Sequence, residues 1–223
     1  MIMKVRSILC LVRIITSIVF VCILGACAAG NNIKISDKDL CAIKSISIDP
    51  VVEVPETPWV HGLNFKGLSG SFFGGLGGGI GAVIGEKKDS KMLQQYLSYH
   101  NIKISEIVLN SFKKNIEQKK LFKIQDNGSV KLKLKIILYG FSRAGAFGYG
   151  EAKPNVNITA TLISEGANTI WRKYDYSGSY GVTVYKFPEL LEKPDLVTRS
   201  LSEASDVVVD KLLSNLKSVS TKQ

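Results

Sequence analysis

A strict alternation along residues 130–136, in a predicted strand of residues 130–139, limits what this chain can fold into more than any other feature of its sequence. Apolar residues take every second position and lysines take the positions between them: Val130, Leu132, Leu134 and Ile136 against Lys131, Lys133 and Lys135. Successive side chains of a strand point to opposite faces, so this pattern predicts a strand that is covered on one side and wet on the other. We interpret the lysine row as a solvated face.

Two further strands are expected after this one. Pro154 opens a segment in which apolar residues again alternate with polar ones, namely Val156, Ile158, Ala160 and Leu162 with Asn155, Asn157, Thr159 and Thr161. Residues 165–168 (Glu-Gly-Ala-Asn) turn the chain, and residues 169–180 return it. Alternating runs separated by turn residues indicate a three-stranded antiparallel meander over residues 130–180.

Helices are expected on both sides of the meander in the sequence. After residue 93 the apolar residues have helical spacing, which breaks near Asn101 and resumes from about Ile104 to Lys119. A last helix starts at Asp195 or Thr198. Its apolar stripe is Val197, Leu201, Ala204, Val208, Leu212 and Val219.

Three short segments complete the expected fold. Residues 42–48 and 121–125 are predicted strands, the second followed by the turn Asp126-Asn127-Gly128, and residues 187–193 are a predicted connector. The pattern as a whole indicates the α+β class, with a four- to five-stranded, mostly antiparallel sheet and two helices packed on one face. We therefore expect a single domain over residues 42–223.

A glycine-rich apolar insertion interrupts this domain at residues 67–85. The tract has no charged residue, and its glycines recur four apart: Gly70, Gly74 and Gly78, and again Gly77, Gly81 and Gly85. This spacing places glycines on one helical face, where backbones approach closely, as in a membrane glycine zipper. Three interpretations stay open: a membrane segment of roughly 28 Å, a helix or hairpin packed on its own domain or on a sister subunit, and a glycine-rich loop.

The N-terminus has the parts of an export signal. Lys4, Arg6 and Arg13 supply positive charge without an acidic residue. Residues 14–24 are then uncharged and apolar, and the run is shorter than the roughly 20 residues that a membrane-spanning helix needs. This segment therefore predicts an export signal, and we do not include it in the expected fold.

The signal ends in Leu24-Gly25-Ala26-Cys27, which is similar to a bacterial lipobox. The likeness implies that a lipoprotein signal peptide, residues 1–26, is removed and that Cys27 is acylated, for example with palmitate. The protein would then hold membrane lipid through Cys27, and residues 27–41 would be a lipidated tether. The alternative is an ordinary cysteine near a secretory cleavage site.

Net charge limits the kinds of partner that we expect, and cysteine usage limits the disulfide and metal chemistry. Residues 1–26 hold three of the 29 basic residues and none of the 19 acidic ones, so residues 27–223 carry +7, against +10 for the whole chain. In an exported protein this surplus indicates anionic lipid, an acidic glycan or an acidic protein, and no nucleic acid. After processing, Cys41 is the one cysteine beside Cys27, which excludes a disulfide scaffold and a thiolate metal cluster. We expect Cys41 to be buried at the head of a strand.

The order of elements and three local patterns resemble a group of envelope lipoproteins and periplasmic domains. The patterns are the lipobox, a helix ending in Leu121-Phe122-Lys123-Ile124, and the strand pair Val156–Leu162 and Thr169–Tyr174. They are similar to those of the curli-secretion lipoprotein, the penicillin-binding-protein activator lipoprotein LpoB and the N-terminal domain of TolB. The resemblance implies a non-catalytic lipoprotein of the bacterial cell envelope that faces the periplasm. Ala28 after the cysteine favours the outer membrane on the same resemblance.

The sequence lacks the parts that catalysis needs. Neither His61 nor His100 stands in a nucleophile pattern, and we expect both on the surface or in loops. Glu86 follows Gly85 where a phosphate-binding loop needs lysine. We therefore expect no enzyme, no cofactor and no metal. Two hypotheses follow: a membrane-anchored protein-interaction or accessory module of envelope machinery, or a self-assembling, membrane-inserting, pore-like homo-oligomer that uses residues 67–85.

The two hypotheses differ in what the glycines do. If the tracts of several subunits pack together, the full-length protein in detergent is an oligomer that Gly74→Leu or Gly78→Leu breaks, because a leucine at the contact keeps the backbones apart. Size-exclusion chromatography with light scattering measures the mass. A monomer in detergent, with or without these substitutions, contradicts self-assembly through the tract.

Overall fold

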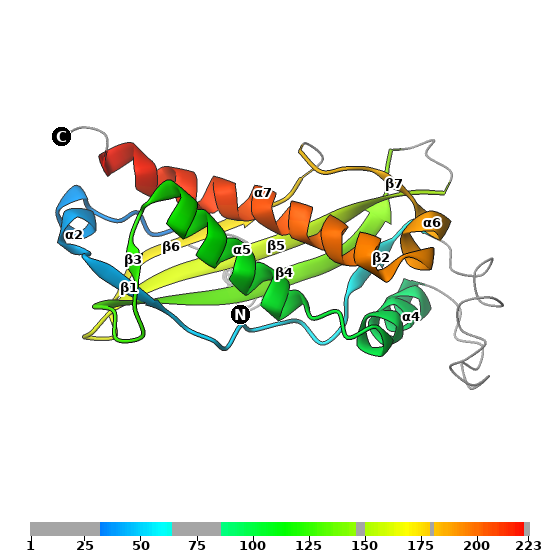
Figure 1. The fold of residues 1–223 in the computed structure, drawn as a ribbon, viewed down its shortest axis with the longest axis horizontal. Helices are drawn as coiled ribbons and strands as arrows, with labels where there is room; N and C mark the ends of the chain where they lie inside the picture. Colours follow the sequence, from blue (N-terminus) through cyan, green and yellow to red (C-terminus); the bar gives the residue numbers. More distant parts are fainter. Residues whose placement is uncertain (1–31, 64–85, 146–149, 179–180, 221–223) are drawn as a thin grey trace, which may run out of the picture. The chain divides into compact units, whose positions relative to one another are not determined.

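Two fourteen-residue strands form the centre of the structure. The computed structural model describes residues 32–63, 86–145, 150–178 and 181–220, and from Ile33 on they belong to one compact unit. Strands β4 (Val130–Arg143) and β5 (Glu151–Ser164) pair antiparallel along their length (Figure 1). The predicted alternation is confirmed: between residues 130 and 136 the apolar side chains are buried, and the lysines between them are exposed.

Shorter strands extend this pair into a mixed sheet of seven strands within the described residues. They are β1 (Ser45–Ile48), β2 (Trp59–His61), β3 (Lys123–Ile124), β6 (Thr169–Tyr176) and β7 (Tyr185–Lys186). The main order is β3-β1-β4-β5-β6, while β2 pairs with β4 and β7 pairs with β5. The predicted antiparallel meander is confirmed as β4, β5 and β6.

The sheet has more strands than the four or five predicted, and it is mixed: the long pairings are antiparallel, as expected, and several short pairings are parallel. β1 pairs parallel with both β3 and β4, and β2 pairs parallel with β4. β2 and β7 have three and two residues, which is too short for an alternation to be visible. Parallel pairing joins segments that are distant in the sequence, and no local pattern encodes it.

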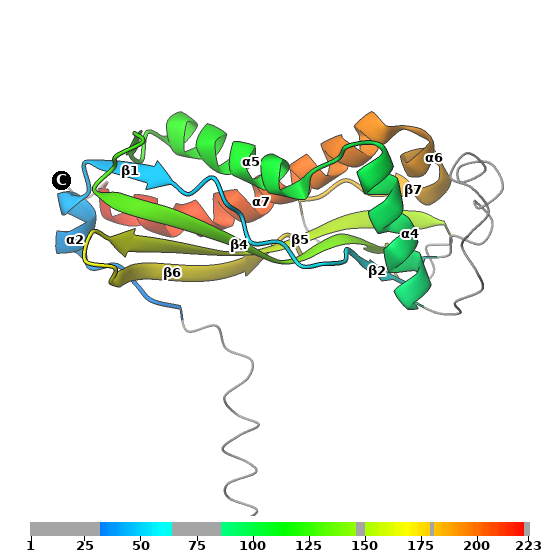
Figure 2. The same cartoon turned by 90° about the horizontal axis from the view of Figure 1, so that it is seen from below.

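Two long helices cover one face of the sheet, as predicted. Helix α5 (Ile104–Lys119) packs on α7 (Pro194–Ser220), which contacts β5 and β6 (Figure 2). The apolar stripe of α7 is buried from Val197 to Leu212. The predicted helix break is confirmed, because α4 (Glu86–Tyr99) ends and Asn101 adopts a left-handed conformation, with φ of 52°, before α5 begins.

Two segments without a predicted helix are helical. Residues 187–193, expected as a connector, form α6 (Phe187–Glu192), which buries Phe187, Leu190 and Leu191. Helix α2 (Asp37–Ala42) overlaps the predicted tether, and the Ser36 hydroxyl caps it by accepting a hydrogen bond from the backbone N–H of Asp39. Cys41 lies in α2 and is exposed, so the prediction of a buried cysteine at a strand was wrong. Helices of six residues span too few turns to show a periodicity.

The folded unit also begins earlier in the chain than predicted. The backbone N–H of Ile33 donates to the carbonyl of Arg172 at 2.8 Å, and the N–H of Arg172 donates to the carbonyl of Ile33 at 3.0 Å. Ile33 therefore adds a paired residue to the edge of β6. Of the expected tether, residues 33–41 belong to the fold.

The chain crosses over β1 on its way from β3 to β4. Ile46 in β1 is the registered partner of Ile124 on one side and of Val130 on the other. Residues 125–129 must therefore pass across the backbone of β1. A Cβ atom at Gly128 would lie 2.2 Å from the carbonyl carbon of Ile46, which is far closer than atoms can approach. The expected turn at residues 126–128 is present, and lack of space is what requires its glycine.

Gly128→Ala is expected to lower the free energy of unfolding by about 1–3 kcal/mol, because the added methyl forces the crossing segment away from β1. Urea denaturation measures the change. Gly166→Ala is the matched control, since the Cβ there would meet its nearest atom, Asn168 Nδ2, at 3.4 Å. Equal losses at the two positions would contradict the tight crossing.

Candidate interaction face

The face of β4, β5 and β6 opposite α5 and α7 carries no helix among the described residues (Figure 2). Side chains of registered partners lie on the same side of a sheet, so the register arranges the outward residues in rows. The rows are Lys131, Ile163 and Thr169; Lys133, Thr161 and Arg172; Lys135, Thr159 and Tyr174; and Leu138, Asn157 and Tyr176. We call this surface the outward face.

Three cations on the outward face form a basic cluster, namely Lys131, Lys133 and Arg172. Lys131 and Lys133 are exposed, and Arg172 is half-buried. Thr161 separates Lys133 from Arg172, which places these two backbones roughly 10 Å apart across β5. Among the described residues, none of the three side chains makes an ion pair or a hydrogen bond.

Lys135 continues the lysine row but has a partner. Its Nζ lies 2.9 Å from Glu53 Oε2, and both side chains are more than half exposed. An ion pair this exposed contributes little to stability, because water and salt screen it. Glu53 also lies beside Lys135 through a parallel bridge of the backbone. The basic cluster is therefore limited to the end of β4 that precedes Lys135.

An open hollow of about 450 Å³ lies beside the basic cluster. Lys131 and Lys133 line it together with Ser129, Ser164 and one acid, Glu165. The hydroxyls of Ser129 and Ser164 already donate hydrogen bonds to backbone carbonyls, Ser129 to Ser45 at 3.1 Å and Ser164 to Asn168 at 3.3 Å. The donors that this hollow offers to a ligand are therefore the two ammonium groups and the hydroxyl of Ser47, which also lines it. Phosphate and carboxylate groups are the acceptors that suit the ammonium groups. Glu165 carries a negative charge and therefore repels an anion that binds next to it.

The other end of the outward face has apolar and aromatic side chains, Ile137, Tyr174 and Tyr176, which are 43 %, 37 % and 53 % exposed. Ile137 protrudes where the register of β4 and β5 shifts. Asn157 Nδ2 donates to Tyr174 Oη at 3.0 Å. Burial raises the pKa of Tyr174, the hydrogen bond from Asn157 opposes this shift, and the negative charge of Asp175 adds to it. Tyr174 is thus neutral at physiological pH. We call these three residues the aromatic end.

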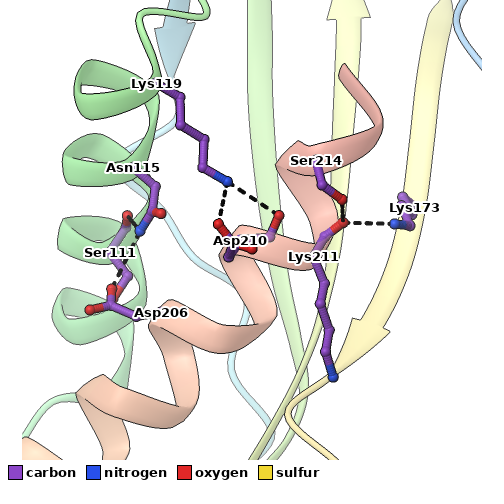
Figure 3. Close-up of polar contacts among 8 residues, drawn as sticks. All are labelled: Ser111, Asn115, Lys119, Lys173, Asp206, Asp210, Lys211 and Ser214. Carbon is purple, nitrogen blue, oxygen red and sulfur yellow. Dashed lines mark hydrogen bonds and ion pairs between the residues drawn. The ribbon is translucent and has the colours of Figure 1, made fainter. Parts of the chain in front are cut away.

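The charged residues between the two long helices have partners, in contrast to the basic cluster (Figure 3). Lys114 Nζ lies 2.8 Å from Asp206 Oδ2, and Lys119 Nζ pairs with Asp210. The buried amide of Asn115 donates to the other oxygen of Asp206 at 3.4 Å. These contacts join α5 to α7, and their charges serve the fold.

A second set of polar contacts joins α7 to β6 (Figure 3). Lys173 points inward and its Nζ donates to the carbonyl of Lys211 at 2.8 Å. Lys211 Nζ donates in turn to the carbonyl of Tyr176 at 3.0 Å. Both lysines are therefore bound within the fold, although Lys173 lies between Arg172 and Tyr174 in the sequence.

The site residues predicted from the sequence lie outside the described residues. This holds for the lipidation site Cys27 and for the glycines of the assembly site, Gly70, Gly74, Gly77, Gly78, Gly81 and Gly85. Both sites stay predictions. The sequence analysis found the lysines of β4 but missed Arg172. Its position beside Lys133 depends on the register of β6, which shifts between Leu162 and Ile163.

The two histidines do not form a site with each other. His61 is exposed in β2 and stacks on Trp59, with ring centroids 5.4 Å apart. The His100 ring contacts the rings of Tyr96 and Tyr99, with ring centroids 4.4 and 4.8 Å apart. In the part of the chain that the structure describes, no group of three or more His, Cys, Asp and Glu side chains could hold a metal ion. No helix in that same part has the length and apolar character to cross a membrane.

Comparison with known proteins leaves the family open. No family model matches the chain. No curated protein matches it. Among solved structures, a PelC dodecamer from Paraburkholderia phytofirmans has 13% identity and a TM-score of 0.37, covering 78% of this chain and 87% of that one. A candidate lipoprotein from Caulobacter crescentus has 10% identity and a TM-score of 0.38, covering 54% and 86%. At these values the likeness carries no argument about family or function.

Mutations of the outward lysines and of the inward leucines between them are expected to have very different effects on the free energy of unfolding. Lys131→Glu with Lys133→Glu should leave the free energy of unfolding nearly unchanged, because neither side chain has a partner in the described fold. Leu132→Ala, at the position between them, should cost about 2–5 kcal/mol, since Leu132 is 1 % exposed. Thermal and urea denaturation measure both. A large loss in the lysine variant would show that the basic cluster serves the fold.

Proposed function

We propose that this protein is a non-catalytic lipoprotein of the bacterial cell envelope, anchored through acylated Cys27 in the outer membrane and facing the periplasm. The signal at residues 1–26, the lipobox and Ala28 support the anchor and its location. In this position the protein acts as a protein-interaction or accessory module of envelope machinery. The outward face is its docking surface for an anionic component.

The basic cluster is the observation that carries the docking role. Three cations occupy neighbouring positions on one uncovered sheet face, beside a hollow and without an ion-pair partner in the described chain. Facing charges attract within about one Debye length, roughly 8 Å at physiological salt. Such complementarity sets the rate and the orientation of docking more than its affinity. The partner must therefore present phosphates or carboxylates.

In-cell photocrosslinking from the outward face tests this proposal. A photoreactive residue at Thr161, between Lys133 and Arg172, is expected to form adducts with an envelope component. Lys131→Glu with Lys133→Glu should remove these adducts by repulsion. A photoreactive residue at Lys113, on the exposed side of α5, is the matched control and should not respond to the charge reversal.

The anchor has its own control, Cys27→Ser, which is expected to move the protein from the membrane fraction to the soluble fraction. Adducts from position 161 that persist after the charge reversal contradict docking through the basic cluster. An absence of adducts from position 161 in cells that contain the anchored protein contradicts the docking surface altogether.

The pore-like alternative rests on the glycine spacing of residues 67–85 alone. These residues lie outside the described part of the chain. The detergent experiment with Gly74→Leu and Gly78→Leu decides it.

A further inference from the structure

The attachment of the chain to β6 limits how far the domain can stand from its anchor. Cys27 and Ile33 are six residues apart, and an extended chain of that length spans at most about 20 Å. Ile33 is held by two backbone hydrogen bonds to Arg172. If Cys27 is acylated, the edge of β6 therefore stays close to the membrane surface.

The residue that fixes this edge also belongs to the basic cluster. Arg172 uses its backbone to bind Ile33, and its side chain lies on the outward face in the row of Thr161 and Lys133. Arg172 is thus carried on the strand at the point of attachment, and Lys131 and Lys133 lie two strands away on β4. A charge influences a membrane surface only within about one Debye length, and a tether of at most about 20 Å allows these strands to come within that range.

We propose that the outward face lies on the anionic lipid head groups of the membrane that holds the anchor. This inference rests on the proposed function and names the anionic component as lipid. Lys131, Lys133 and Arg172 contact phosphates, and the hollow beside them admits a head group between the two lysines. Glu165 also lines the hollow, and its negative charge disfavours a phosphate placed next to it.

The aromatic end suits the same surface. Tyr174 and Tyr176 are 37 % and 53 % exposed, and Ile137 adds an apolar side chain to the same end of the face. Side chains with an apolar body and a polar tip are enriched at the level of lipid head groups. The cationic end and the aromatic end of this face therefore both suit the head-group region of a membrane.

The contribution of this contact is orientation, because the acyl chain already supplies retention. One cation near an anionic membrane changes the equilibrium between face-down and other orientations about fivefold, so three cations change it about a hundredfold. With the outward face on the lipid, α5 and α7 point away from the membrane. The ion pairs between these helices keep their charges satisfied in that exposed position.

Probe accessibility on the anchored protein tests the orientation. The full-length acylated chain with Cys41→Ser carries a fluorophore on a single cysteine, Thr161→Cys on the outward face or Lys113→Cys on α5. It is reconstituted in vesicles of phosphatidylcholine alone or of phosphatidylcholine with phosphatidylglycerol. We expect iodide quenching at position 161 to fall severalfold with phosphatidylglycerol and to recover in high salt, while quenching at position 113 stays constant.

Charge variants identify the cause. Lys131→Glu with Lys133→Glu should abolish the protection at position 161. The matched control, Lys38→Glu with Lys91→Glu, changes the net charge equally at exposed positions in α2 and α4 and should preserve it. Equal loss of protection in both variants would overturn the inference, because net charge rather than the outward face would then be responsible.

The outcomes separate this inference from the proposed function. Equal quenching at position 161 in both kinds of vesicle overturns the lipid contact. If photocrosslinking at Thr161 then captures a protein in a charge-dependent way, the docking surface stands and its anionic partner is a protein. If neither protection nor adducts occur, the proposed docking surface falls as well.

Discussion

The structure depends on the one-sided burial of the long pair β4 and β5. Every second side chain of these strands points toward α5 and α7, and Val156, Ile158 and Ala160 of β5 are fully buried there. Burying an aliphatic side chain contributes about 1.5–3 kcal/mol, so this layer supplies much of the stabilisation. The same pleat leaves the alternate residues on the outward face. Core and candidate docking surface are thus two sides of one pattern.

The charged residues also differ between the two sides of the sheet. Asp206 and Asp210 on α7 hold lysines of α5, and Lys173 and Lys211 are bound to backbone carbonyls between α7 and β6. These groups serve the fold. Charges of the basic cluster have no such partner among the described residues, so their electrostatic energy is available to a ligand. This difference between paired and unpaired charges, rather than the overall surplus of positive charge, indicates that the outward face is an interaction surface.

A lipid anchor and an oriented sheet face would act together. In the proposed arrangement, an acyl chain on Cys27 would hold the protein at the membrane whatever its orientation, while the cations of the outward face would select one orientation. The pairing of Ile33 with Arg172 connects the two, because it joins the end of the tether to the strand that carries one of the cations. A tether that reached to residue 41 would allow the domain to move farther from the membrane, and the pairing at Ile33 would shorten this reach.

Local periodicity allowed the sequence by itself to determine the helix at residues 104–119, the meander and the buried and exposed faces of β4. Tertiary structure alone decided the parallel insertion of β1 between β3 and β4, the helical turn of α6 and the neighbourhood of Lys133 and Arg172. Each of these depends on contacts or registers between distant segments, and two register shifts alter which residues meet. A period of two or 3.6 residues fixes which way a side chain points, and only packing decides what lies beside it.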